Sequence, residues 1–240
     1  MIKFIHRFID FIFPQRCLCC GKVIHSDDSL CVDCFERINF ITGPFCKHCG
    51  SPLYSENDLS DELYCVSCLN HKDAFRFCRS AILYDDGSKK LLLDFKFSDR
   101  TENRKLLAKW LFLAGKDIFS AGVDLLIPIP LHYTRLLKRK YNQSAILAKE
   151  LSTLTNIPVE YKSLKKIKRT LPQVLCNGKQ RQKNVKNAFK VANTERIKNK
   201  RIVLIDDVYT TGATMKECTK VLLNAGAKSV DVLTVAKVVS

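Results

Sequence analysis

The stretch IVLIDDVYTTGAT, residues 202–214, decides how the fold of this 240-residue chain is read. Four apolar residues predict a buried strand, two acids stand at its carboxyl end, and a loop rich in threonine and glycine opens a helix. Ligands of open α/β sheets bind at that edge of the sheet. A strand that merely ends in a solvated acid pair before a capped helix explains the threonines and the glycine only one at a time. The stretch therefore predicts a binding site.

The chemistry of the loop favours a sugar phosphate. Asp206 and Asp207 are placed to accept hydrogen bonds from ribose hydroxyls and to attract a hydrated Mg²⁺ ion. Backbone N–H groups and hydroxyls can surround a phosphate, and the positive end of the following helix favours a dianion. These phosphate-binding positions are Thr210, Thr211, Gly212, Ala213 and Thr214.

Strand and helix patterns alternate around this stretch and predict an α/β domain with a mostly parallel sheet over residues 75–240. Strands are expected at 79–84, 123–129, 201–205 and 229–235, and helices at 102–119, 143–154 and 214–225. Residues 1–14 predict a short amphipathic helix. No apolar run approaches the roughly 20 residues that span a bilayer. We expect a cytoplasmic protein without stable membrane insertion.

Cysteines define a second module, predicted over residues 15–72. Nine of the twelve cysteines lie between Cys17 and Cys68. Eight of them form four C-x-x-C pairs: Cys17 and Cys20, Cys31 and Cys34, Cys46 and Cys49, and Cys65 and Cys68. Two such pairs complete a tetrahedral shell of four thiolates around zinc. Shells made only of thiolates leave no position for water, so two structural zinc ions are expected.

Three questions about the cysteines stay open at this point. A disulfide framework is the alternative to zinc, but it requires an oxidising compartment and the chain shows no export signal. The pairs can combine in sequence order or in a cross-brace. Cys19 is either a bystander or an alternative ligand, whereas Cys78, Cys176 and Cys218 are expected to be small buried residues.

The chain is strongly basic. Forty lysines and arginines against 24 acids give a formal net charge of +16, which attracts polyanions such as nucleic acid. The alternative interpretation is a general excess of lysine that serves no nucleic-acid binding. Phe45, Tyr64, Phe75 and Phe77 lie near the cysteine pairs, where they serve either for stacking on single strands or as the module's own small core.

Residues 202–214 resemble the 5-phosphoribosyl-1-pyrophosphate (PRPP) motif of type I phosphoribosyltransferases. Two further blocks are similar to the ComF family of competence-associated proteins, in which a double zinc ribbon precedes a phosphoribosyltransferase domain. The first block comprises Pro128, Ile129, Pro130, Leu131, His132, Arg135, Arg139, Asn142 and Gln143. The second comprises Arg169, Thr170, Gln173, Arg181, Asn184 and Phe189.

The resemblance implies a type I phosphoribosyltransferase-like fold that binds PRPP with Mg²⁺. It assigns PRPP binding to Asp206, Asp207, Val208, Tyr209, Thr210, Thr211, Gly212, Ala213 and Thr214, with Lys96, Arg135 and Arg139 on the pyrophosphate side. Asp206, Asp207, Arg135 and Arg139 are also the candidate catalytic residues. The alternative interpretation of Arg135 and Arg139 is that they are ordinary charged residues on a helix surface.

One position departs from the family pattern, because Lys140 stands where the family usually has glycine. Either the backbone there avoids positive φ, or pyrophosphate approaches differently. Lys140 could also add a phosphate contact.

Two functions follow from the resemblance. The first is a protein of DNA uptake that binds PRPP and single-stranded DNA, with DNA-uptake proteins as partners. The second is an active phosphoribosyltransferase with an unidentified small acceptor. The sequence shows no acceptor-binding motif.

Overall fold

The structure is a computed structural model that describes residues 14–24, 29–54, 63–70, 73–97, 101–169 and 185–239. The helix predicted for residues 1–14 lies outside the described residues, apart from Pro14. The same holds for Thr170, Gln173, Cys176, Arg181 and Asn184.

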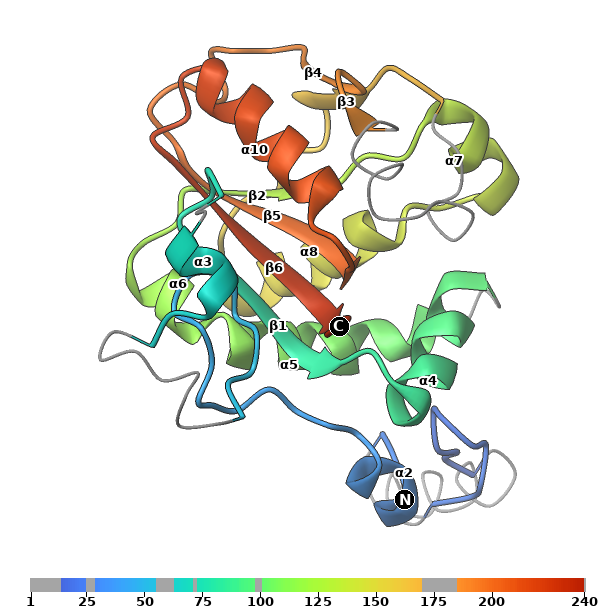
Figure 1. The fold of residues 1–240 in the computed structure, drawn as a ribbon. Coiled ribbons are helices and arrows are strands. Elements are labelled where there is room, and N and C mark those ends of the chain that lie inside the picture. Colours follow the sequence, from blue (N-terminus) through green and yellow to red (C-terminus); the bar gives the residue numbers. More distant parts are fainter. Residues whose placement is uncertain are drawn as a thin grey trace.

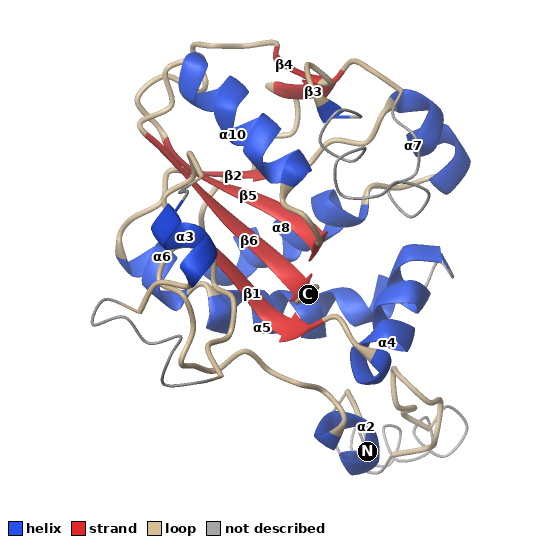
Figure 2. Cartoon of the chain, viewed as in Figure 1, coloured by secondary structure: helices blue, strands red, loops and turns tan. Residues whose placement is uncertain are grey.

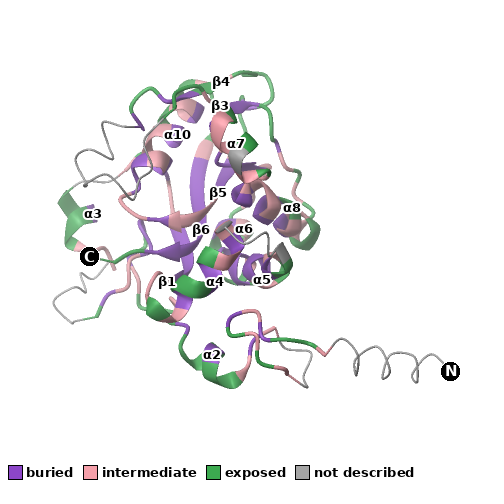
Figure 3. Cartoon of the chain, turned by 90° about the vertical axis from the view of Figure 1, so that its right-hand side faces the viewer, coloured by how far each residue is buried: buried purple, intermediate pink, exposed green. Residues whose placement is uncertain are grey.

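A four-stranded parallel sheet forms the centre of the molecule, in the order β1-β6-β5-β2 (Figure 1). Its strands are β1 (Cys78–Leu83), β2 (Leu125–Pro128), β5 (Arg201–Tyr209) and β6 (Ser229–Lys237). Most residues of these strands are apolar and buried, because helices or the cysteine module cover both faces of the sheet. The prediction of a mostly parallel sheet is confirmed, and Figure 3 shows its strands largely buried.

Helices cover the two faces of the sheet. α5 (Arg104–Ala114) and α8 (Gln143–Thr155) pack together on one face, and α10 (Ala213–Asn224) packs on the other. The helix predicted at 102–119 is divided. After the 3-10 turn η2 (Thr101–Asn103), α5 ends at Gly115, whose ψ of 11° leaves the helical range, and α6 (Lys116–Ser120) follows.

Four short or weakly patterned elements complete the domain. α4 (Asp86–Phe97) follows β1, and α7 (Tyr133–Arg139) follows β2. β3 (Leu164–Lys166) and β4 (Phe189–Val191) form a separate antiparallel pair that contacts α10 (Figure 2). Three-residue strands are too short to show a period, which explains why the sequence patterns did not predict them.

The cysteine module packs directly on the sheet domain. It contains α2 (Val32–Glu36) and α3 (Val66–Asn70). Its first half shares a core with α4, where Cys34 and Ile38 lie in the same cluster as Leu91. The linker between the halves pairs with the outer edge of β1, since Ile41 N donates to Ala81 O at 2.9 Å. The linker thereby covers an edge strand that would otherwise expose unpaired backbone groups.

The second half of the module contacts the same strand at its beginning. Cys78 N donates to His48 O at 2.7 Å. Gly50 lies so close to the carbonyl of Cys78 that any Cβ at position 50 would collide with it. Both halves of the cysteine module are therefore fixed to β1 or α4.

Candidate functional site

The loop after β5 has the backbone geometry of an anion site. β5 does not end at residue 205 as predicted but continues through both acids to Tyr209, because β6 pairs with it as far as Lys237. Gly212 then takes a φ of +71° and caps α10. A Cβ at position 212 would also collide with the Tyr209 phenol, so the turn needs glycine for two reasons. The first N–H groups of an α-helix have no acceptor within the helix, so the start of α10 favours an anion.

Asp206 is the more perturbed of the two acids. Its carboxylate accepts a hydrogen bond from Ser144 Oγ of α8 at 2.7 Å. The surrounding protein desolvates it and raises its pKa to about 7, and the charge of Asp207 adds to this rise. The Asp206 carboxyl is therefore protonated in part of the molecules near neutral pH, and a bound cation can displace this proton.

Asp207 is held by a cation from a distant part of the chain. Lys96 Nζ, near the end of α4, lies 2.8 Å from Asp207 Oδ2, and both side chains are largely buried. Two side chains at and just before the start of α8 bind the backbone of α4 near this contact: Gln143 Nε2 donates to Lys96 O at 2.9 Å, and Tyr141 Oη donates to Phe95 O at 3.2 Å. These two side chains thus fix the end of α4 beside the acids.

Asn142 joins the two ends of the loop between β2 and α8. Its Nδ2 donates to Ile129 O at 3.0 Å, and its Oδ1 accepts from Ser144 N at 3.1 Å as the N-cap of α8. Asn142 therefore also orients Ser144, the donor to Asp206.

The helix α7 carries the two candidate arginines. Burial lowers the pKa of Arg135, and the charge of Arg139, four residues further along the helix, lowers it further. Lys140 follows them with a φ of +64°, in the left-handed region. The alternative of a right-handed or extended backbone at Lys140 is therefore wrong. The lysine occupies a conformation that glycine adopts more easily.

Lys166 of β3 is a further cation whose charge interacts with candidate site residues, and no sequence motif predicts it. Burial lowers its pKa and the charge of Arg135 lowers it further, while the charge of Asp206 acts in the opposite direction. Its Nζ lies 5.3 Å from the centre of the Phe189 ring. No sequence signal marks it, because it stands in a run of lysines in which only the fold distinguishes one from another.

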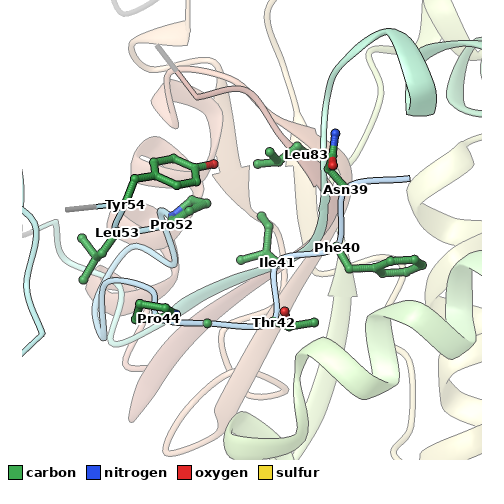
Figure 4. A pocket seen from close by; sticks show the side chains of 10 residues that line it. Asn39, Phe40, Ile41, Thr42, Pro44, Pro52, Leu53, Tyr54 and Leu83 are labelled. Carbon is green, nitrogen blue, oxygen red and sulfur yellow. The ribbon is translucent and has the colours of Figure 1, made fainter. Parts of the chain in front are cut away.

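Two hollows in the surface differ in the charge of the side chains that line them. A hollow of about 20 Å³ lies at the loop and is lined by Asp206 and by residues 208–210 and 212–215. A larger pocket of about 480 Å³ lies between the module linker and its second half (Figure 4). Residues 39–44, 52–54 and Leu83 line it, and none of these side chains is charged. The larger pocket therefore does not suit a phosphate ester.

The cysteines form two clusters in sequence order, which resolves the pairing question. The clusters are Cys17, Cys20, Cys31 and Cys34, and Cys46, Cys49, Cys65 and Cys68, with all sulfur atoms of a cluster within 4.8 Å of one another. Cys20 and Cys31 Sγ atoms are 3.7 Å apart, as are those of Cys49 and Cys65. Ligands about 2.3 Å from a tetrahedral Zn²⁺ ion stand about 3.8 Å apart. The two clusters suit two structural zinc ions.

The remaining described cysteines are not part of these clusters. Cys19 is buried beside the first cluster but outside its four-sulfur set, so it is a bystander. Cys78 and Cys218 are fully buried, as predicted. Every described cysteine is a free thiol, so the disulfide alternative finds no support among them.

The aromatic residues near the module serve internal packing. Phe75 is 1% exposed and stacks on His48 with ring centres 4.9 Å apart. The Arg79 guanidinium lies over both Phe45 and Phe77, at 4.9 and 5.3 Å. Tyr64 packs against the second cluster. These contacts favour the core interpretation over stacking on nucleic acid.

The fold and the two clusters define a class: a protein with a double zinc ribbon ahead of a phosphoribosyltransferase-type domain. Family models agree, since a double zinc ribbon domain matches residues 8–69 and a phosphoribosyl transferase domain matches residues 141–239. Competence protein F of Haemophilus influenzae is 31% identical over 94% of this chain and 98% of its own length. The chain belongs to the ComF family of competence proteins.

Two further relatives are more distant. The DNA utilization protein YhgH of Escherichia coli K12 is 26% identical over 90% of this chain and 87% of its own length. Competence protein ComFC of Bacillus subtilis is 27% identical over 85% of this chain and 82% of its own length. Within the described part of the chain, no helix is long and apolar enough to cross a membrane.

Proposed function

We propose that this protein acts in DNA uptake or DNA utilization in the cytoplasm, binding PRPP with Mg²⁺ at residues 206–214 and single-stranded DNA on its basic surface. The names of its relatives, competence protein and DNA utilization protein, support the process. The observation that carries PRPP binding is the junction of β5, the Gly212 turn and α10, with two acids on one side and helix N–H groups on the other.

The parts of PRPP have distinct partners in this proposal. The 5-phosphate lies against the backbone N–H groups of residues 210–214, where the positive end of α10 stabilises it. The ribose hydroxyls face Asp206 and Asp207. Asp206 and Asp207 would hold a hydrated Mg²⁺ ion, which would supply positive charge beside the pyrophosphate, and Lys96, Arg135 and Arg139 offset the remaining charge of the pyrophosphate.

Calorimetry tests the PRPP site. We expect the wild-type protein to bind PRPP in the presence of Mg²⁺, and the double variant Asp206→Ala/Asp207→Ala to lose that binding. Glu195→Ala is the matched control, because Glu195 is an exposed acid outside the loop. Undiminished binding by the double variant rejects this site.

Binding of single-stranded DNA is supported by the net charge and by α7. The formal charge of +16 favours contacts with phosphates, and Tyr133, which is 67% exposed, lies on the same short helix α7 as the two arginines. An exposed aromatic ring on a basic element suits stacking of unpaired bases. The affinity for a labelled oligonucleotide, measured by fluorescence anisotropy, should fall steeply as salt rises. Absence of binding at low salt contradicts this part of the proposal.

Phosphoribosyl transfer is the second candidate function. The observation that favours it is the β3–β4 pair, which contacts α10 through β4 and carries Lys166, a partly buried cation whose pKa responds to the charges of Arg135 and Asp206. In such a reaction an acceptor nucleophile bonds to ribose C1 as the bond to pyrophosphate breaks, and the pyrophosphate leaves with the bonding electrons. Release of pyrophosphate in the presence of candidate acceptors, lost in Asp206→Ala/Asp207→Ala, tests turnover separately from binding.

A further inference from the structure

The last residue of β6, Lys237, is a buried cation that links two parts of the protein. It is only 4% exposed. Its Nζ donates a hydrogen bond to the backbone oxygen of Cys49 at 3.1 Å and lies 3.9 Å from the centre of the Tyr209 ring. Burial of an ammonium group is unfavourable unless polar partners compensate it. These two contacts compensate the burial of the Lys237 ammonium.

Both partners of Lys237 belong to candidate binding sites. Cys49 is a member of the second four-cysteine cluster. Tyr209 is the last residue of β5, pairs with Lys237 in the sheet register, and presses its phenol against Gly212 at the turn of the loop. A continuous line of contacts thus runs from Cys49 through Lys237 and Tyr209 to Gly212.

Charge strengthens the connection. A Zn²⁺ ion bound by four thiolates is an anionic group, and Lys237 supplies a positive charge beside it. The face of the Tyr209 ring carries negative potential toward the same ammonium. Cys49 and the other three cysteines of the cluster would hold zinc, which would restrain the Cys49 backbone; this backbone accepts the hydrogen bond from Lys237, and Lys237 contacts the Tyr209 ring.

We propose that Lys237 and Tyr209 are positioning residues that couple the second four-cysteine cluster to residues 206–214, so that zinc and a phosphate ester strengthen each other's binding. The inference rests on the proposed function for the choice of PRPP as the ester. Coupling between two sites is reciprocal by thermodynamic necessity. The effect of PRPP on zinc is therefore as informative as the effect of zinc on PRPP.

The experiment measures zinc release and cysteine labelling in the same protein. Zinc-loaded wild-type protein is mixed with a chelator that leaves Mg²⁺ free, with and without PRPP, in the presence of an alkylating reagent. We expect PRPP to slow labelling of the second cluster about fivefold or more, a typical coupling. The first cluster serves as the internal control, because the contact through Lys237 and Tyr209 starts from Cys49 of the second cluster.

Variants identify the link. Lys237→Met keeps the aliphatic stem and removes the ammonium, and we expect it to lose the protection of the second cluster and to bind PRPP correspondingly more weakly. Lys228→Met is the matched control, because Lys228 is exposed, and it should behave as the wild type. The wild-type comparison requires no variant to fold.

The outcomes separate this inference from the proposed function. Binding of PRPP to the wild type without slower labelling of the second cluster overturns the coupling alone. Equal slowing at both clusters also overturns it, since that is a general effect of stability. Absence of PRPP binding to the wild type overturns the proposed function and the coupling with it.

Discussion

A drop in pH from 8 to 6 is expected to weaken the binding of Mg²⁺ and PRPP because it protonates Asp206. Desolvation, reinforced by the charge of Asp207, raises the pKa of this carboxyl to about 7. The group is therefore neutral below that value and ionised above it. Only the ionised form attracts the hydrated metal and accepts two hydrogen bonds from ribose hydroxyls.

The expected size follows from the populations. With a pKa of about 7, roughly nine-tenths of the carboxyl groups are ionised at pH 8 and roughly one-tenth at pH 6. The apparent Kd rises in inverse proportion to the competent fraction, so it should be about tenfold higher at pH 6.

Calorimetric titrations at pH 6, 7 and 8 measure this dependence. The phosphates of PRPP titrate near pH 6 themselves, so Asp206→Asn is the control that leaves only the ligand's contribution. Ser144→Ala is a second test. Ser144 donates to the carboxylate and favours its charged form, so its removal should move the midpoint to higher pH. Identical pH profiles for the wild type and both variants would show that ionisation of Asp206 does not control the binding of PRPP.

Three further outcomes are expected. Lys140→Gly should raise the free energy of unfolding by up to about 1 kcal/mol in urea titrations, because glycine takes the positive φ without strain; a loss of stability contradicts this. Gly212→Ala should lower PRPP affinity while the zinc content stays at two ions per chain, since its Cβ meets Tyr209; unchanged affinity counts against the loop geometry. Lys96→Met should weaken PRPP binding more than about tenfold by calorimetry, because it leaves Asp207 without its cation, and equal affinity refutes that role.

Folding has its own dependence on Asp206. Because the folded-state pKa of Asp206 is raised, the folded protein binds a proton that the unfolded chain has released, and stability falls as pH rises from about 4 toward 7. As pH rises over this range, the thermal midpoint of the wild type should therefore fall relative to that of Asp206→Asn. A constant difference between the two midpoints contradicts the raised pKa.

Local sequence predicts the elements whose residues carry a clear period or an unbroken apolar run. β6 and α10 were predicted on this basis, since Val230 to Val235 are buried strand residues and Met215, Cys218 and Leu222 recur on one helix face. β5 was predicted too short because its last residues are polar. Its length depends on pairing with β6, a contact that is set by the whole sheet.

Contacts within the candidate site depend on residues far apart in the sequence. Ser144 and Asp206 are 62 positions apart, and Lys237 and Cys49 are 188 apart. Motif spacing identifies the loop and the cysteine pairs because each is a local feature. It does not identify Lys166 or Lys237, since a lysine acquires a role only when packing places and buries it.

A crystal structure with PRPP and Mg²⁺ bound tests the PRPP site most directly. We expect the 5-phosphate within hydrogen-bond distance of the backbone N–H groups of residues 210–214 and the ribose hydroxyls at Asp206 and Asp207. A PRPP molecule in the uncharged pocket lined by residues 39–44 and 52–54, with the loop empty, would contradict it.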